Sequence, residues 1–485
     1  MVNDLNKTQK LLPIRAKPYQ HQINAFEYVG SKFGLDNGLP SSTGAALLME
    51  MGTGKTLTTI AVLGAMYIAG KIKRALIVAP LSIVSVWQEE FEKFAHFEYN
   101  AVILEGTMKK KQDTLKHMTG EALQVAIVNY ESAWRMEAEL LKFDADIVIA
   151  DEGHKIKTQN TRQSKALHKL GAKARYKMLL TGTVITNKAI DVFSQYKFIN
   201  PSVFGQSFYV FRNKYFDMVG YGNHTPVLKK SMEQDLTEKL HSIAFRVTKA
   251  ECLDLPEITE IVRYVELEST AARIYKDLVK DSYAELSKGE VTITNVLTRL
   301  LRLSQLTGGF IADDNSMVTN VSTAKLEALS DIIDEAVNED KKLVVIARFV
   351  AEIKAIEKLL QKKKLNYSLI MGGIKDRETQ VTQFQINPDI KVFIGQIATA
   401  GLGITLTAAN TMVFYSLDYS MSNFEQTKAR IHRVGQKKNC TYIYLSAKGT
   451  VDEKVLKALQ NKADLARMLV DEYKNGANPF VLKGR

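Results

Sequence analysis

Residues 44–60 join two local patterns through a turn that contains two glycines. The apolar run from Ala45 to Met49 is typical of a buried strand, and the stretch from Leu57 to Leu63 is typical of a helix. Gly52 and Gly54 allow the backbone between them to bend, so that its N–H groups converge on an anion at the helix N-terminus. The stretch therefore predicts a phosphate-binding loop, with an ordinary glycine turn as the alternative.

The side chains of this loop indicate which anion it would hold. Lys55 is expected to reach the β- and γ-phosphates of ATP, and the Thr56 hydroxyl is expected to bind Mg²⁺. Met49 replaces the first glycine of the G-x-x-x-x-G-K-[ST] pattern, so the loop alone does not decide the function. Upstream, Gln20 is a candidate reader of the adenine edge, although a surface glutamine would look the same. The predicted nucleotide-binding residues of this half are Gln20, Gly52, Thr53, Gly54, Lys55 and Thr56.

A second polar cluster follows the apolar strand predicted over residues 147–150. Asp151 and Glu152 come directly after this strand, and nucleotide hydrolysis requires two carboxylates in such a place. We predict that Asp151 holds Mg²⁺ and that Glu152 orients or deprotonates the attacking water. Two acids at a strand end are often only a solvated turn. That alternative loses weight because the phosphate loop ends a strand in the same alternating α/β pattern.

Three more strand ends carry polar residues. Open α/β sheets bind ligands at the carboxyl ends of their strands, so Ser82, after strand 74–79, is a candidate DNA-phosphate contact. Tyr130 follows strand 124–128 and is a second DNA candidate. The turn after strand 176–180 contains Thr181, Gly182 and Thr183, which are candidates for sensing the γ-phosphate. Helix 85–94 also carries Trp87 among apolar residues at helical spacing, and we interpret these aromatics as core.

The second half of the chain repeats the strand-turn-helix arrangement. Gly401 and Gly403 follow strand 391–395 and would let backbone amides approach a phosphate closely, with Thr407 as a further DNA contact. On a helix over 425–436, Gln426, Arg430 and Arg433 would share one face, which suits an arginine finger acting on a γ-phosphate. A surface basic patch is the alternative. We assign Gly403 and Gln426 to nucleotide binding, and Arg430 and Arg433 to catalysis.

Composition limits the remaining choices. The 485 residues carry a net charge of +12 with a pI near 9.2, which favours a polyanionic partner. The two cysteines are far apart in sequence, which disfavours a zinc site or a disulfide framework. No run approaches the ~18 apolar residues needed to span a bilayer, and the first residues lack the apolar core of a signal peptide. We therefore expect a cytosolic or nuclear protein.

Taken in order, these motifs resemble those of SWI/SNF-type DNA translocases of helicase superfamily 2. The stretches that carry the resemblance are LLMEMGTGKTLTTI, ALIVAPLSIVSVWQEEFEKF, IVIADEGHKIKT, KMLLTGTVITN and EQTKARIHRVGQ. The resemblance runs from about Pro18 to about Leu469, and its fifth motif is similar to that of the fork-remodelling, annealing-helicase branch.

The resemblance implies an α/β fold of two tandem RecA-like lobes with parallel sheets, over residues 1–257 and 258–485. A helical protrusion would begin at about residue 201, and the segment 201–320 reads as mainly helical. The implied cofactors are ATP and Mg²⁺, and the implied partner is duplex or branched DNA, bound with little sequence preference by a monomer. His154, Thr181, Gly182 and Thr183 would couple the nucleotide state to DNA.

Three departures from the family pattern bear on coupling to DNA rather than on hydrolysis. Val184 replaces a common proline, residues 419–421 replace Trp-Asn-Pro, and Ala429 replaces an acid. The predicted function is an ATP-dependent DNA translocase acting in replication, repair or recombination, in a bacterial or phage-infected cell or a nucleus. A strand-separating helicase, a nucleotide-gated DNA-binding scaffold and an RNA-directed motor remain as alternatives.

Overall fold

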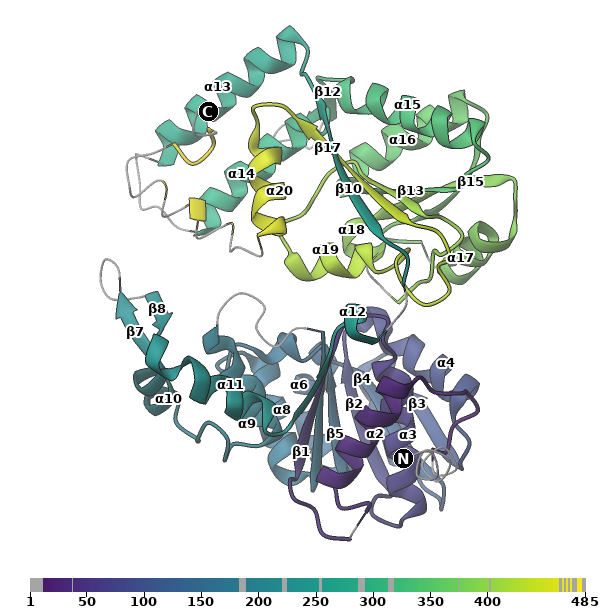
Figure 1. The fold of residues 1–485 in the computed structure, drawn as a ribbon, viewed down its shortest axis with the longest axis vertical. Helices are drawn as coiled ribbons and strands as arrows, with labels where there is room; N and C mark the ends of the chain where they lie inside the picture. The colour runs from purple at the N-terminus through teal and green to yellow at the C-terminus, as the bar shows by residue number, and fades with distance from the viewer. Residues whose placement is uncertain are drawn as a thin grey trace. The chain divides into compact units, whose positions relative to one another are not determined.

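The computed structural model describes residues 12–36, 38–182, 189–219, 225–252, 255–286, 293–312, 318–374, 376–400, 403–461, 465, 468–469, 472 and 478–481. The chain divides into two compact units, Met1–Asp254 and Leu255–Arg485, and Figure 1 draws both. The sequence placed this boundary after residue 257. Each unit is built on a parallel sheet covered by helices, so the prediction of an α/β fold with two parallel-sheet lobes is confirmed.

Among the described residues, the first unit contains a seven-stranded sheet in the order β3-β4-β2-β5-β6-β1-β9, with every neighbouring pair parallel. Its strands are β1 (Gly44–Met49), β2 (Arg74–Ala79), β3 (Tyr99–Ile103), β4 (Leu123–Asn129), β5 (Ile147–Asp151), β6 (Tyr176–Thr181) and β9 (Ala244–Val247). The helices between them are α2 (Gln20–Lys32), α3 (Lys55–Ile68), α4 (Val84–Phe94), α5 (Met108–Lys116), α6 (Tyr130–Arg135), α7 (Glu137–Phe143), α8 (Arg162–Lys173) and α9 (Val192–Ile199). Three short 3-10 turns, η1 (Leu81–Ile83), η2 (Gly153–Ile156) and η3 (Ala189–Asp191), lie among them.

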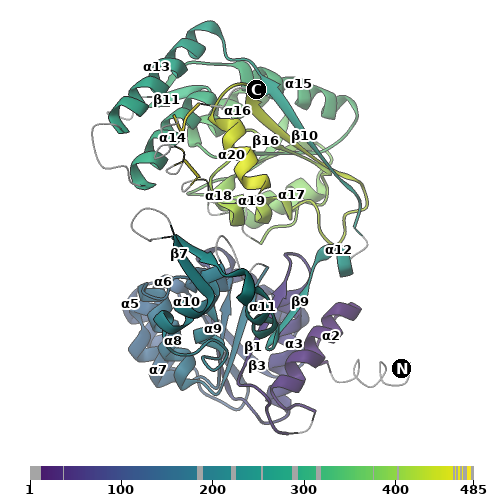
Figure 2. The same cartoon turned by 60° about the vertical axis from the view of Figure 1, so that its left-hand side comes forward.

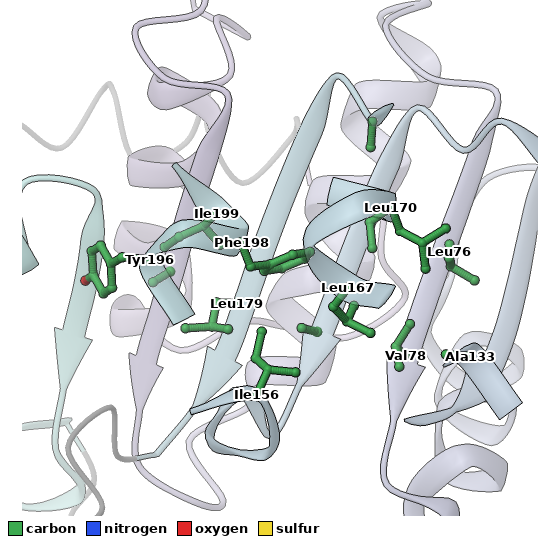
Figure 3. Packing of buried hydrophobic residues seen from close by; sticks show 14 of the residues in the cluster. Leu76, Val78, Ala133, Ile156, Leu167, Leu170, Leu179, Tyr196, Phe198 and Ile199 are labelled. Atoms are coloured by element: carbon green, nitrogen blue, oxygen red, sulfur yellow. The ribbon is translucent and has the colours of Figure 1, made fainter. Parts of the chain in front are cut away.

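The central strands are continuous apolar runs because both of their faces are buried. In β2, Leu76 and Val78 belong to the buried cluster on one face of the sheet, where Figure 3 shows Leu76 near Leu170 of α8 and Val78 near Ala133 of α6. The intervening Ile77 packs on the other face, against α2, α3 and α4. Side chains of successive strand residues point to opposite faces, so one strand serves both cores.

The last part of the first unit departs from the predicted helical segment. The helix predicted over 204–216 is α10 (Phe208–Tyr215), followed by a β-hairpin of β7 (Phe216–Val219) and β8 (Thr225–Leu228). The helix predicted over 232–245 is a 3-10 turn, η5 (Lys230–Met232), and then α11 (Glu233–His241). The chain next forms β9, which pairs with β1, and α12 (Lys249–Cys252). These strands are four residues long and lack a clear period, which is why the sequence did not reveal them.

The second unit contains a six-stranded parallel sheet in the order β10-β17-β16-β13-β15-β14. Its strands are β10 (Ile258–Val265), β13 (Leu343–Ala347), β14 (Asn366–Ile370), β15 (Ile390–Gln396), β16 (Thr411–Phe414) and β17 (Cys440–Ala447). Its helices are α13 (Ser269–Leu286), α14 (Ile293–Thr307), α15 (Ala324–Asn338), α16 (Val350–Lys362), α17 (Arg377–Ile386), α18 (Ile397–Ala400), α19 (Met421–Lys428) and α20 (Val451–Gln460). A small antiparallel pair, β11 (Phe310–Ala312) and β12 (Val318–Asn320), follows α14.

The same two-faced packing organises this sheet. In β13, Val345 packs with α15 and α16, and the neighbouring Val344 packs with α14 and α20. Figure 2 shows α13 and α14 beside one another in this unit. The sequence does not reveal β10 because, as an edge strand, it leaves most of its residues exposed and shows no buried run. The described residues include no helix of the length and apolar character needed to cross a membrane.

Candidate nucleotide site

The turn between β1 and α3 has the backbone that its glycines predict. Gly52 and Gly54 both have positive φ angles, 82° and 90°, and Gly54 is the N-cap residue of α3. The Lys55 Nζ donates to the Met49 carbonyl at 2.8 Å and lies 3.4 Å from the Glu50 carbonyl. Thr56 occupies the first turn of α3 and is partly exposed. The loop therefore places the Lys55 ammonium group and the N-terminal amides of α3 at the carboxyl end of a strand. An anion site requires this arrangement.

Two residues that the sequence did not single out support this loop from α2. The His21 Nε2 lies 2.7 Å from the Thr53 carbonyl oxygen, and the Gln22 Nε2 donates to the same oxygen at 3.1 Å. A Cβ atom on Gly54 would lie 2.0 Å from the Gln22 Nε2, so glycine is required there by space as well as by its φ angle. Gln20, predicted to read adenine, is exposed and donates to Asn24 Oδ1 at 2.7 Å.

The two predicted carboxylates lie at the end of β5. Asp151 is the last residue of that strand, and Glu152 follows with φ 51° and ψ 55°, a left-handed conformation that costs a non-glycine residue about 1–3 kcal/mol. Glu152 Oε2 lies 3.2 Å from His154 Nδ1, and both side chains are nearly buried. Gly153 follows Glu152, and a Cβ atom on Gly153 would lie 2.3 Å from Leu179 Cδ1. The turn after β5 therefore packs directly onto β6.

The electrostatics of Asp151 set it apart from a solvated turn residue. Its side chain is buried, and burial together with the neighbouring Glu152 carboxylate raises its pKa to about 6. Lys55, the Trp87 indole and the Glu152 main-chain N–H oppose that rise. A carboxylate whose ionised form is disfavoured by burial and by a neighbouring carboxylate is suited to binding a cation. Because Asp151 and Glu152 are both buried, they do not form the solvated turn that was the alternative.

Two aromatic side chains surround Asp151. The Trp87 Nε1 donates to Asp151 Oδ2 at 2.9 Å, and the Glu152 N–H donates to Oδ1 at 2.9 Å. The Tyr130 hydroxyl donates to the Asp151 main-chain oxygen at 2.7 Å. Tyr130 is 5% exposed, which leaves little surface for the DNA contact predicted for it. Burial, followed by the carboxylates of Asp151 and Glu152, raises the pKa of Tyr130 well above its usual value.

The strand between the loop and the carboxylates carries two of the residues predicted to couple nucleotide and DNA. β6 lies between β1 and β5 in the sheet, and Thr181 is fully buried at its end, in register with Leu48. A Cβ on Gly182 would lie 3.6 Å from the Met49 carbonyl oxygen, so this turn runs beside the phosphate loop. Thr183 lies outside the described residues. Ser82 lies in η1, at the carboxyl end of β2.

The predicted arginine pair of the second unit converges without the predicted helix. α19 ends at Lys428, with Ala429 as its C-cap residue, so the prediction of a helix through residue 436 is wrong. The Nη1 atoms of Arg430 and Arg433 each nevertheless lie 3.3 Å from the Ile404 carbonyl oxygen. Arg430 is 5% exposed and also donates to the Gln426 carbonyl at 2.9 Å. Both guanidinium groups thus lie beside the turn that contains Gly403.

The remaining predicted residues of this unit surround that turn. Gly403 has a φ angle of 65°, and the Thr407 hydroxyl accepts from Gln385 Nε2 at 3.3 Å. The Gln426 side chain donates to Ser422 Oγ at 3.1 Å. Gln436, which the sequence placed on the helix without a role, donates to the carbonyls of Thr407, Ala409 and Ile431 and so fixes the two segments to each other.

Comparison with known families identifies this arrangement. Residues 17–308, well over half of the chain, match the SNF2-related domain. The chain belongs to the SNF2-related family. Residues 324–435 match the helicase conserved C-terminal domain. The predicted resemblance to SWI/SNF-type enzymes of helicase superfamily 2 is confirmed. The finer placement in the fork-remodelling branch stays a prediction.

Individual relatives agree with this membership. The chain is 28% identical to a DNA repair and recombination protein RAD54-like from Drosophila willistoni and 27% identical to that of Drosophila yakuba, over 96% of its own length in both cases. It spans 64% of the length of each of these relatives. Among solved structures, it is similar to the Sulfolobus solfataricus SWI2/SNF2 ATPase core in complex with dsDNA, with 25% identity, coverage of 98% of both chains and a TM-score of 0.46.

Proposed function

We propose that the chain is an ATP-hydrolysing motor that moves along or remodels duplex or branched DNA. The observation that carries the proposal is the pair of buried carboxylates, Asp151 and Glu152, at the same sheet edge as the phosphate loop with Lys55. The RAD54-like relatives are named for DNA repair and recombination, which favours those processes over others. The chain's net charge of +12 is in keeping with a polyanionic partner.

The residues of the loop fit ATP with Mg²⁺. Positive φ angles at Gly52 and Gly54 leave backbone N–H groups available to phosphate oxygens, and Lys55 supplies a charge that can leave the Met49 carbonyl for a phosphate. Hard oxygen ligands suit Mg²⁺, which in such sites keeps several waters and uses one or two protein oxygens. We assign these to the Thr56 hydroxyl and the Asp151 carboxylate. The bound ion would neutralise charge that develops on the phosphates.

We assign the chemistry of water activation to Glu152. Its carboxylate is nearly buried and is held by His154 Nδ1 at 3.2 Å, so its orientation is fixed before a substrate arrives. A carboxylate in this position accepts a proton from the attacking water, or orients that water in line with the leaving group. His154 joins this carboxylate to the η2 turn. We propose that His154, Thr181 and Gly182 couple the state of the bound nucleotide to DNA.

We also assign Arg430 and Arg433, which lie in the second unit, to catalysis. Their guanidinium groups converge on the Ile404 carbonyl beside Gly403, so two positive charges are presented together. Such charges stabilise a phosphoryl group in transition. We propose that ATP binding and hydrolysis drive movement along, or remodelling of, the DNA. DNA would be bound through its phosphates, with Ser82 and Thr407 as proposed contacts, in the nucleus or in a bacterial or phage-infected cell.

The test is the steady-state ATPase rate of the chain alone and with single-stranded DNA, duplex DNA, forked DNA or duplex RNA, at two salt concentrations. Stimulation by duplex or forked DNA that weakens with salt supports the translocase. Stimulation chiefly by single strands favours a strand-separating helicase, and stimulation by RNA favours an RNA-directed motor. Equal rates in all conditions would contradict a nucleic-acid-driven motor and leave the DNA-binding scaffold.

Two variants test the site assignment in the same assay. Lys55→Ala and Glu152→Gln should each lower the DNA-stimulated rate by at least ~10²-fold, because phosphate neutralisation and water activation are lost. DNA binding, measured by fluorescence anisotropy, should remain. Glu137→Gln is the matched control and should keep its rate, because it alters only an ion pair between Glu137 of α7 and Lys169 of α8. Normal turnover in either site variant would refute the assignment.

A further inference from the structure

Trp87 lies in the core of the first unit, yet its one polar atom is directed at the candidate metal site. The side chain is 1% exposed and belongs to α4, which packs against the sheet together with Phe91. Its Nε1 donates to Asp151 Oδ2 at 2.9 Å in a fully buried hydrogen bond. A buried indole N–H requires an acceptor, and here the acceptor is a carboxylate rather than a backbone oxygen.

Each oxygen of the Asp151 carboxylate accepts one hydrogen bond from the protein. Oδ2 accepts from the Trp87 indole, and Oδ1 accepts from the Glu152 N–H. A carboxylate has about four lone-pair positions, so one donor at each oxygen fixes the plane of the group and still leaves both oxygens able to accept further partners. The Tyr130 hydroxyl holds the main-chain oxygen of the same residue. The side chain therefore has a set orientation.

We propose that Trp87 is a positioning residue that orients the Asp151 carboxylate for a nucleotide-bound divalent cation. Partners that hydrogen-bond a metal-binding group fix its geometry, and their loss typically costs 10–100-fold in metal affinity or activity. A phenylalanine at position 87 would fill much of the same space but would leave Asp151 Oδ2 buried without its donor. This inference rests on the proposed function, because it presumes that Asp151 holds the cation.

The binding of Mn²⁺, used in place of Mg²⁺, tests the inference without relying on turnover. Full-length protein saturated with ADP is titrated with Mn²⁺, and free Mn²⁺ is measured by electron paramagnetic resonance. Trp87→Phe should weaken Mn²⁺ binding by about 10-fold. Phe91→Leu is the matched control, because it trims a buried aromatic of the same helix that has no polar atom, and it should bind Mn²⁺ within about twofold of the wild type. Equal weakening in both variants, or none in Trp87→Phe, would overturn the inference.

A second measurement leaves Trp87 in place. Trp87 and Trp134 are the two tryptophans of the chain, so Trp134→Phe makes Trp87 the sole indole fluorophore. Adding Mn²⁺ or Mg²⁺ to the ADP-bound Trp134→Phe protein should change the emission of Trp87, and Asp151→Asn in that background should abolish the change. An emission that does not respond to the cation would also overturn the inference.

The Asp151→Asn variant separates the two levels of the argument. If Asp151→Asn binds Mn²⁺ as the wild type does, the cation lies elsewhere and the proposed metal assignment fails. If Asp151→Asn loses Mn²⁺ but Trp87→Phe keeps it, the assignment stands and only the role of Trp87 fails.

Discussion

Glu352 of the second unit is a buried acid whose replacement should change how stability depends on pH. It lies in the first turn of α16 and is 1% exposed. Its Oε2 accepts from the Arg348 N–H at 3.1 Å, from the Phe349 N–H at 3.0 Å and from the Ser416 hydroxyl. Its Oε1 has no hydrogen-bond partner among the described residues. Burial outweighs these donors and raises the pKa of Glu352 to about 7.

The sign and size of the effect follow from this pKa. The folded chain holds the proton of Glu352 more tightly than the unfolded chain, in which the pKa is near 4.5. The resulting stabilisation is fully present below pH 4.5 and is lost as the pH rises through about 7. A rise from 4.5 to about 7 corresponds to about 3 kcal/mol. Glu352→Gln is neutral at every pH and keeps an oxygen for the three donors, so it should not show this loss.

Urea unfolding followed by circular dichroism between pH 5 and pH 9 measures the effect. The free energy of unfolding of Glu352→Gln, relative to the wild type, should rise by about 3 kcal/mol over this interval. A constant offset from the new amide group cancels when the two ends of the interval are compared. Glu266→Gln, which removes a carboxylate that is 83% exposed, is the control and should follow the wild type. Parallel curves for Glu352→Gln and the wild type would refute the reasoning.

Two further predictions concern an arginine of the second unit and a cysteine of the first. Arg433→Ala should lower kcat by about 10³-fold with little change in KM for ATP, because a finger acts mainly in the transition state; an unchanged kcat would place the finger elsewhere. The pKa of the Cys252 thiol is raised by burial, then by the carboxylates of Glu50 and Glu251. Glu50→Gln should therefore lower that pKa and speed alkylation of Cys252 by iodoacetamide at pH 8, whereas an unchanged rate would show that Glu50 does not act on the thiol.

Local patterns predicted those parts of the site that a single stretch of chain creates. Asp151 ends a buried strand, and Lys55 follows a buried strand across a short turn, so an apolar run followed by a turn locates both without knowledge of the sheet. The parallel sheet then brings these ends to one edge, because strands of the same direction end on the same side. Periodicity and spacing were sufficient for these residues, since neither depends on a partner far along the chain.

Residues that act through a distant partner were not predicted. Trp87 has the spacing of a core residue and is one, and only its buried hydrogen bond to Asp151, 64 positions away, reveals a second role. The sequence analysis names Gln20 and not Gln22 as a nucleotide-binding residue. Both are glutamines near the start of an amphipathic helix, and the sequence does not state which side chain turns inward. In α2, Gln22 is buried against the phosphate loop and Gln20 is exposed.

The two arginines converge in the structure although the element predicted to carry them is wrong. The prediction put Arg430 and Arg433 on one helical face, but α19 ends at Lys428 and the chain continues in tight turns. In a helix or a tight turn, residues three apart return to the same side, so the spacing of the two arginines mattered more than the element. The Ile404 carbonyl then accepts from both guanidinium groups, and the Arg430 carbonyl accepts from the Leu406 N–H at 2.9 Å. The convergence of charge is thus fixed by contacts with the Gly403 turn, which the sequence could not supply.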